Sequence, residues 1–122
     1  MAGSGSGSSL ILLEVRALGG AYARPGEHPN AFCHRDARYS VLAVGLAADA
    51  DMAARAMIDA ERVFGALAPW DNGRVWPNFG PVTDEASARR AYDEPTLRRL
   101  GEVARRYDPD GVLQIGRWTR DL

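Results

Sequence analysis

The feature that most constrains the fold is an apolar stripe between Asp49 and Pro69. Apolar side chains recur there at spacings of three and four residues, which puts them on one face of an α-helix. A carboxylate at Asp49 or Asp51 can accept hydrogen bonds from the backbone N–H groups that begin such a helix. Because Pro69 cannot continue it, we predict that the helix ends near Leu67 or Ala68. The stripe consists of Ala53, Ala56, Met57, Ala60, Val63, Phe64 and Leu67.

Strand patterns precede this helix. Residues 10–18 start with four apolar residues and then alternate polar and apolar, which is typical of a strand with one buried face. A loop rich in proline and glycine follows, and residues 38–46 have the composition of a second strand. We interpret residues 31–35 as a short strand, joined to the longer one through a kink or bulge at residues 35–38.

Weaker strand signals follow the helix. After a turn at Asn72–Gly73, residues 74–79 predict a short strand, and Pro77 confines that strand to an edge or an end of a sheet. A second turn is predicted at residues 108–111, where Pro presets φ and Gly permits a positive φ. Residues 112–115 either add a final strand or pack against the core.

Two further helices are expected between those turns. Thr83 can cap a short helix that runs to about Tyr92. Asp93 or Glu94 can cap the next helix, and Pro95 is suited to its first turn. The residues predicted to form the buried face of this last helix are Leu97, Leu100, Val103, Ala104 and Tyr107.

The order of elements predicts an α+β fold, a mostly antiparallel sheet with two to three helices packed on one face. Residues 1–9 are rich in Gly and Ser and lack the charged and apolar regions of a signal peptide, so we interpret them as a linker or tag. Residues 10–122 are then one domain or part of one, which fits the total of 122 residues.

Charge and cysteine content exclude several classes of function. The net charge is −1, which offers no electrostatic footprint for nucleic acid or an acidic membrane surface. The longest apolar run after the linker, residues 10–13, is too short to span a bilayer. A single cysteine, Cys33, rules out an internal disulfide and favours a reducing compartment, so a cytoplasmic location is expected. We interpret Cys33 as a half-buried strand residue and not as a nucleophile.

Several patches, in order along the chain, resemble the C-terminal part of berberine-bridge-type flavin oxidases. In that family an aromatic-x-Asn-aromatic strand is followed by a helix that closes with a basic residue and Tyr-Asp-Pro. Two upstream patches are also similar to strands of the family's substrate domain, so the resemblance covers most of the chain. The patches are VRALGGA at 15–21, HRDARY at 34–39, VWPNF at 75–79, AY at 91–92, LRRL at 97–100 and ARRYDPD at 104–110.

The resemblance implies a part of an FAD-dependent oxidase. Family members bind FAD in an N-terminal domain, often covalently, and oxidise alcohols, sugars or alkaloid-like compounds by hydride transfer to the flavin, which oxygen reoxidises. The substrate domain covers the flavin ring, and residues 10–122 would be its last portion. No flavin-binding segment is expected within these 122 residues, so we expect the chain alone to be inactive and to bind no FAD, and its partner to be the missing flavin domain or a second copy. His28, Cys33 and His34 do not match the family's attachment segments.

Three residues of the VWPNF patch are candidate site residues by resemblance. Asn78 matches the family's strand asparagine and is predicted to contact both flavin and substrate, since an amide donates and accepts hydrogen bonds. Trp76 stands where the family commonly has tyrosine; an indole only donates, so Trp76 is expected to stack on substrate and no catalytic residue is assigned. Phe79 completes the substrate-binding set. Each has a structural alternative: Asn78 ending an edge strand, Trp76 half-buried in it, and Phe79, like Tyr107, in the core.

A second function stays open from the sequence. The chain could be a stand-alone module derived from that domain, which binds a partner or a second copy through an exposed strand edge and an apolar face. A metal site is not expected, because His28 and His34 are too few and lack paired cysteines or carboxylates.

Overall fold

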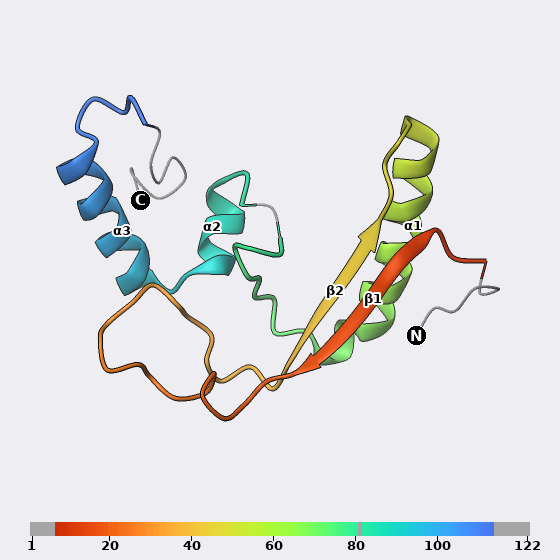
Figure 1. Cartoon of the computed structure of the whole chain (residues 1–122), viewed down its shortest axis with the longest axis horizontal. Helices are drawn as coiled ribbons and strands as arrows, with labels where there is room; N and C mark the ends of the chain where they lie inside the picture. The colour runs from red at the N-terminus through yellow and green to blue at the C-terminus, as the bar shows by residue number, and fades with distance from the viewer. Residues whose placement is uncertain (1–6, 81, 114–122) are drawn as a thin grey trace. The chain divides into compact units, whose positions relative to one another are not determined.

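The computed structural model describes residues 7–80 and 82–113. Their fold class is α+β, as predicted, and the two strands form an antiparallel sheet (Figure 1). Residues 1–6 of the predicted linker and residues 114–115 of the predicted final strand lie outside the described part of the chain. The elements are β1 (Leu10–Ala17), β2 (Tyr39–Gly45), α1 (Ala50–Leu67), the 3-10 helix η1 (Ala68–Trp70), α2 (Glu85–Ala91) and α3 (Glu94–Tyr107).

The chain divides into two compact units that are discontinuous in sequence. The sheet unit comprises the described residues of 1–23 and 37–72, and so contains β1, β2 and α1. The helical unit comprises residues 24–36 and the described residues from 73 onward, and so contains α2 and α3. The middle of the long connection between β1 and β2, residues 24–36, therefore belongs to the helical unit. The prediction of one domain over residues 10–122 stays a prediction.

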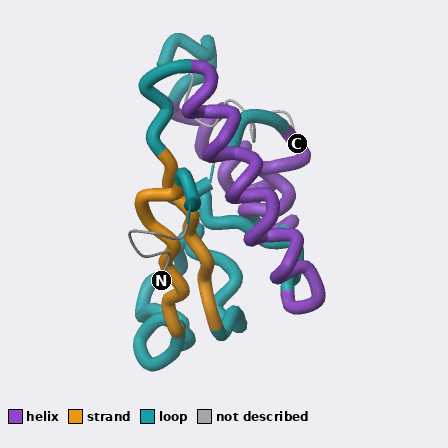
Figure 2. The backbone as a smooth tube through the Cα atoms, turned by 90° about the vertical axis from the view of Figure 1, so that its right-hand side faces the viewer, coloured by secondary structure: helices purple, strands orange, loops and turns teal. Residues whose placement is uncertain are grey.

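β1 and β2 begin and end within one residue of their predicted bounds, so both predicted strands are confirmed. Figure 2 shows them as the two strands of the described chain. The predicted burial of one face is not seen in β1, because Leu10 is its one buried residue and the others are half-buried or exposed without alternation. The strands pair antiparallel, with Val15 opposite Val41, and the ladder continues past the end of β1, where the Leu18 N–H donates to the Arg38 carbonyl at 2.8 Å. A register shift between Leu10 and Leu12 interrupts the pairing near the start of β1. Such a bulge bends a strand and limits the length over which it can pair.

α1 has the predicted bounds and the predicted cap. The Asp49 carboxylate accepts from the Met52 N–H at 2.7 Å, and the helix ends at Leu67, two residues before Pro69. α1 lies against the sheet where β2 ends, because a Cβ added at Gly45 would overlap the Cβ of Ala56. Glycine is thus required at Gly45 by close packing and not by an unusual φ.

The start of the described chain is fastened to α1. The Asp59 carboxylate accepts from the Ser9 N–H and the Ser9 hydroxyl, both at 2.7 Å, and from the Ser8 hydroxyl at 3.3 Å. The backbone hydrogen bond from Ser9 is the main cause that lowers the pKa of Asp59. The last residues of the predicted linker therefore make specific contacts with the sheet unit.

Two predicted strands are wrong. Residues 31–35 are an irregular loop without strand pairing. Residues 74–79 end in a turn in which the N–H groups of Phe79 and Gly80 both donate to the Trp76 carbonyl, at 3.0 and 2.9 Å. Pro77 has no N–H to give to a sheet ladder and its φ suits the second position of a turn, so this segment folds on itself. Val112 and Leu113, the described part of the predicted final strand, are not in a strand either.

α2 and α3 are present, with one correction to their caps. The cap of α2 is Asp84 and not Thr83: the Asp84 carboxylate accepts from the Ser87 N–H at 2.7 Å, and the Asp84 N–H donates to the Ser87 hydroxyl at 3.1 Å. This reciprocal pair is a capping box. Asp93 caps α3 as predicted and accepts from the Thr96 N–H at 2.9 Å.

The predicted buried face of α3 is partly correct. Leu97 and Ala104 are buried, and Leu100 and Val103 are half-buried, but Tyr107 is 67% exposed. Tyr107 is the last residue of the helix, and beyond it the chain turns at Asp108, whose carbonyl accepts from the Gly111 N–H at 3.1 Å. Among the described residues, no helix combines the length and the apolar character needed to cross a bilayer.

Candidate functional site

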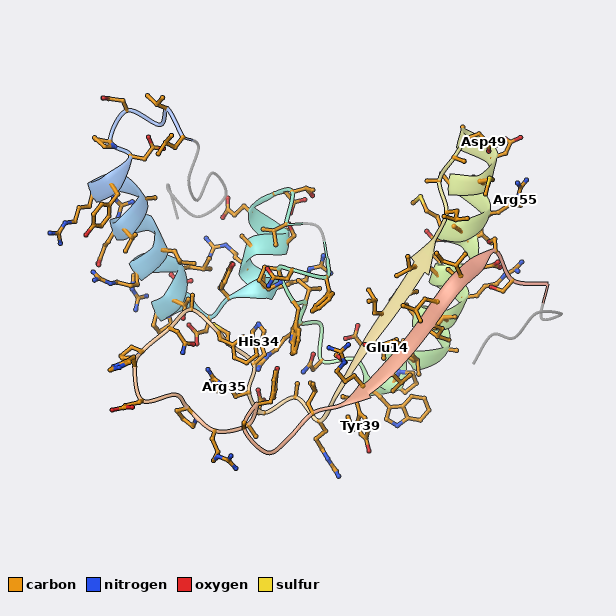
Figure 3. The ribbon with its side chains drawn as sticks, viewed as in Figure 1. Glu14, His34, Arg35, Tyr39, Asp49 and Arg55 are labelled. Atoms are coloured by element: carbon orange, nitrogen blue, oxygen red, sulfur yellow. The ribbon has the colours of Figure 1, made fainter. Side chains whose placement is uncertain are left out.

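The helical unit gathers three segments at the C-terminal end of α2. The Arg90 carbonyl accepts from the Val75 N–H at 3.2 Å and lies 3.0 Å from the His34 Nε2. The last carbonyls of a helix have no partner within it, so these contacts satisfy a group that α2 leaves open. Because a carbonyl only accepts, the His34 Nε2 carries the hydrogen in this contact. The loop that bears His34 and Arg35 (Figure 3) and the segment after Gly73 are thereby joined to one helix end.

His34 adopts an uncommon backbone conformation. Its φ of 60° is in the left-handed region, which costs a residue with a Cβ about 1 kcal/mol or more. The contact with Arg90 accompanies this conformation and positions the imidazole between two hollows of the helical unit, both of which His34 lines. His is one of the few residue types, with Asn and Asp, that are enriched at positive φ, but nothing in the neighbouring sequence singled out His34.

An aromatic cluster lies beside the smaller of these two hollows, described first. The ring of Trp76 packs edge-on against Phe32, with centroids 5.5 Å apart and planes at 73°, and lies 5.9 Å from the ring of Phe79. The Arg35 guanidinium lies over Phe32, 4.5 Å from the ring centroid. Edge-to-face pairs and cations over ring faces are favourable because of the ring quadrupole. We call the first hollow the aromatic groove; it is lined by Ala31, Phe32, Cys33, His34, Val75, Trp76, Pro77, Asn78 and Ala91.

The structure brings two of the three candidate residues together. Trp76 and Asn78 both line the aromatic groove, whereas Phe79 contacts the Trp76 ring without lining it. Trp76 is half-buried, Asn78 is exposed and Phe79 is 52% exposed, so Phe79 is not a core residue. Their shared turn, and not the predicted strand, places Trp76 and Asn78 on the same groove.

The aromatic groove is small. Its volume is about 60 Å³, well below the several hundred Å³ that encloses a cofactor or a drug-sized ligand. An isoalloxazine ring does not fit inside it. The groove can therefore serve as one wall of a larger site, on which the face of Trp76 and the amide of Asn78 are presented.

The second hollow is larger and polar. Its volume is about 460 Å³, and it holds two ion pairs: Arg74 with Asp36 at 3.0 Å and Arg89 with Glu94 at 3.2 Å. Arg89 also pairs with Glu85 at 2.9 Å, so an incoming anion would compete with carboxylates for both guanidinium groups. We call it the polar hollow; it is lined by His34, Asp36, Arg74, Arg89, Tyr92, Asp93, Glu94 and Leu97. None of the three candidate residues from the sequence lines it.

Two side chains of the polar hollow have shifted acidities. Burial, followed by the neighbouring Cys33, raises the pKa of Tyr92, so its phenol stays protonated at neutral pH and acts as a donor and not as a base. The side-chain hydrogen bond from Thr96 is the main cause that lowers the pKa of Asp93, so this carboxylate is ionised and acts as a helix cap. Neither shift prepares a general base.

Cys33 has the environment of a structural residue. Its thiol is half-buried, and its Sγ lies 3.4 Å from both the Ala31 carbonyl and the Thr96 hydroxyl. The expected half-buried position is confirmed, although the segment is a loop and not a strand. Over residues 7–80 and 82–113, no group of three or more His, Cys, Asp or Glu side chains is placed to hold a metal ion.

The chain matches no protein-family model, no curated protein and no solved structure. The residues of the chain and their geometry are therefore the basis for its function.

Proposed function

We propose that this chain is the C-terminal substrate-domain portion of a berberine-bridge-type FAD-dependent oxidase. The observation that carries the proposal is the ordered set of similar patches from Val15 to Asp110. The geometry supports it further, because successive patches occupy successive local structures: the turn of Trp76 and Asn78, the end of α2, the length of α3 and the turn after it. The last four patches thus coincide with structural features of the helical unit, whereas VRALGGA lies in the sheet unit and HRDARY has residues in both units.

Within such an oxidase, the aromatic groove would form part of the wall that faces substrate and flavin. The Asn78 amide is exposed and can donate to one polar edge and accept from another. The Trp76 ring can stack on a flat or sugar-like substrate, but its indole cannot accept a proton. Hydride transfer would be the chemistry of the FAD, which the rest of the oxidase would hold, since the groove is too small to enclose it. A cytoplasmic location fits the free thiol of Cys33.

The first test asks whether the chain binds FAD alone and whether it completes a flavoprotein. The purified chain, mixed with FAD and passed through a gel-filtration column, is expected to elute colourless. The reading frame upstream of this chain, or a neighbouring one, is expected to encode an FAD-binding segment, and its co-expression with the chain is expected to yield a yellow complex. A chain that retains flavin by itself, or a genome without such a segment nearby, would contradict the proposal.

The second test addresses Asn78 in that yellow complex. Asn78→Ala is expected to lower turnover with an alcohol or sugar substrate and to shift the flavin absorption band, because an amide next to the flavin is lost. Asn72→Ala is the matched control, since Asn72 is also exposed but lies in the sheet unit, and it should change neither quantity. Equal effects of the two substitutions would remove Asn78 from the site.

A second function, self-association, is favoured by the surface of the sheet unit. Its sheet has two strands, and isolated pairs of strands are at best marginally stable in water. Ile11, Val15 and Tyr39 are 60–61% exposed, and Met57 is 63% exposed. Large exposed apolar side chains such as these are the kind that protein–protein interfaces cover.

A further inference from the structure

The outer edge of β1 has a determined hydrogen-bonding pattern. The Leu18 N–H donates to Arg38 of the opposite chain segment, and backbone groups of antiparallel strands alternate between the two sides. The N–H and C=O groups of Glu14 and Arg16 therefore point towards β2, and those of Leu13, Val15 and Ala17 point away from it. Within the described sheet, β1 has β2 as its neighbour on one side and no strand on the other.

We propose that β1 pairs antiparallel with β1 of a second copy of this chain, about a two-fold axis at Val15. The Val15 residues of the two copies would exchange both backbone hydrogen bonds, and Leu13 of each copy would do the same with Ala17 of the other. The product is a four-stranded antiparallel sheet in which β2 of each copy is an outer strand. Its interface is isologous, the type found in symmetric dimers.

The side chains of β1 select this register. When Val15 lies opposite Val15 of the second copy, Glu14 lies opposite Arg16, and Arg16 opposite Glu14. These are non-hydrogen-bonded pairs, in which Cα atoms are about 4.5 Å apart and side chains are closest. Acid therefore meets base twice at each interface.

Neighbouring registers are disfavoured by the same charges. The outward backbone groups allow pairings that differ by steps of two residues. One such step places Glu14 opposite Glu14 of the second copy, and the opposite step places Arg16 opposite Arg16. Like charges directly opposite each other on a sheet are destabilising.

The apolar residues of β1 match in the same register. Leu13, Val15 and Ala17 lie on one face of β1. On the same face of the sheet, β2 has Val41 and Gly45, and α1 lies against that face. Pairing would bring Val15, now 61% exposed, against its equivalent. Glu14 (Figure 3) and Arg16 occupy the other face, where they form an exposed ion pair at 2.8 Å within one chain that two pairs between copies would replace.

Pairing would extend along β1 only as far as the register shift permits. The shift between Leu10 and Leu12 ends the regular ladder at one end, and Ala17, opposite Tyr39, is the last residue of β1 paired with β2 at the other. The contact is short, so we expect a reversible dimer. The inference rests on the proposed self-association and is independent of the proposed flavin-oxidase role.

Charge reversal tests the register in solution. Light scattering after gel filtration, and sedimentation equilibrium over a concentration series, are expected to show a monomer–dimer equilibrium of the full chain. Glu14→Arg or Arg16→Glu alone puts like charges opposite each other at two symmetric positions, and each is expected to weaken dimerisation at least about tenfold. The double variant E14R/R16E restores acid opposite base and is expected to recover the dimer.

Disulfide formation tests the two-fold axis. In a Cys33→Ser background, Val15→Cys is expected to give a disulfide-linked dimer under mild oxidation, because Cα atoms of a hydrogen-bonded pair are about 5.5 Å apart. Ala17→Cys is the matched control: in the proposed register it lies opposite Leu13 and far from its own equivalent, so it should not cross-link. Circular dichroism of every variant checks that the chain still folds.

Self-association and the register of β1 can be contradicted separately. A chain that stays monomeric at all concentrations overturns self-association, and protection of the Val15 amide from hydrogen exchange in that monomer would show another segment on the edge. A dimer that forms but ignores the charge reversals, or that cross-links equally at residues 15 and 17, overturns the β1 register alone. Neither result changes the flavin test described above.

Discussion

The sheet unit and the helical unit are stabilised in different ways. The sheet unit has the longest helix and both strands of the described chain, yet Leu10 is its one buried apolar side chain among the described residues. The helical unit has shorter helices and long turns, but it contains the other buried apolar side chains. These are Ala88, Ala91, Leu97 and Ala104.

Regular secondary structure and burial are therefore separate properties in this chain. The sheet unit depends on a backbone ladder, one helix and surfaces that remain accessible to a partner. The helical unit depends on small buried side chains and on hydrogen bonds at helix ends, such as those to Ser87 and to the Arg90 carbonyl. A substitution in one unit should therefore destabilise that unit, while the amides of the other unit keep their protection from hydrogen exchange.

Leu97→Ala is expected to have the largest effect. Leu97 is 1% exposed and is the largest fully buried side chain of the described chain, so truncation removes buried surface and leaves a cavity. The free energy of unfolding measured in urea should fall by about 2–4 kcal/mol. Exchange of α2 and α3 amides should rise, while β1 and β2 amides keep their protection. Val112→Ala is the control, because Val112 is 79% exposed and its truncation should change little. Equal losses in both units would show that they do not unfold separately.

Gly45→Ala is expected to act on the sheet unit instead. The added methyl would overlap the Cβ of Ala56, so α1 must shift away from β2 at a cost of about 1–3 kcal/mol. Exchange of α1 amides should rise while that of α3 stays the same. Adding Ala56→Gly removes the overlap and should restore part of the stability, less the roughly 1 kcal/mol cost of glycine in a helix. If the two substitutions are simply additive, Gly45 and Ala56 are not in contact.

Asp93→Ala is expected to have a smaller effect, confined to the start of α3. It removes the cap that accepts from the Thr96 N–H, which costs about 1 kcal/mol. Asp93→Asn retains an accepting oxygen and should recover most of the loss. Helix content by circular dichroism, together with exchange of the Thr96 amide, measures both variants. An Asn variant as unstable as the Ala variant would mean that the charge of Asp93 matters more than its hydrogen bond.

The smallest expected effect is the pH dependence of the contact between Ser9 and Asp59. The folded pKa of Asp59 is lowered, mainly by the Ser9 N–H, so the contact stabilises the sheet unit above the unfolded pKa of about 4. That contribution should disappear as the pH falls through the lower, folded pKa. The Ser9 amide signal in NMR should follow the Asp59 titration, and Asp59→Asn should remove the dependence. A Ser9 amide that does not respond between pH 5 and pH 2 would contradict this contact.

Much of the fold could be predicted from local patterns. The strands, the long helix and α3 each have a hydrophobic period and a boundary signal, such as Asp49, Pro69 or Asp93, within a few residues of the element. The short segments at 31–35 and 74–79 were predicted wrongly, because a few apolar residues become a strand only where a partner strand exists. Pro77, which has no N–H to donate to a sheet ladder, favours the turn that the structure has.

The candidate site was predictable only in part. Resemblance singled out Trp76 and Asn78, and the structure places both on one groove, but their function there stays a prediction. The role of His34 was not visible, because its positive φ and its contact with Arg90 depend on residues far along the chain. The packing of Phe32 on Trp76 depends on such distant residues as well.

The contact between His34 and the Arg90 carbonyl also has a consequence for the order of folding. The two residues are 56 positions apart, so the helical unit cannot close until Arg90 has left the ribosome. All residues of the sheet unit precede position 73, and they can therefore pair and pack during synthesis. Residues 24–36 therefore stay unpacked after β1 and β2, the strands on either side of them, have paired. Contacts of such long range slow folding, so closure of this loop is expected to be the late step in the maturation of the nascent chain.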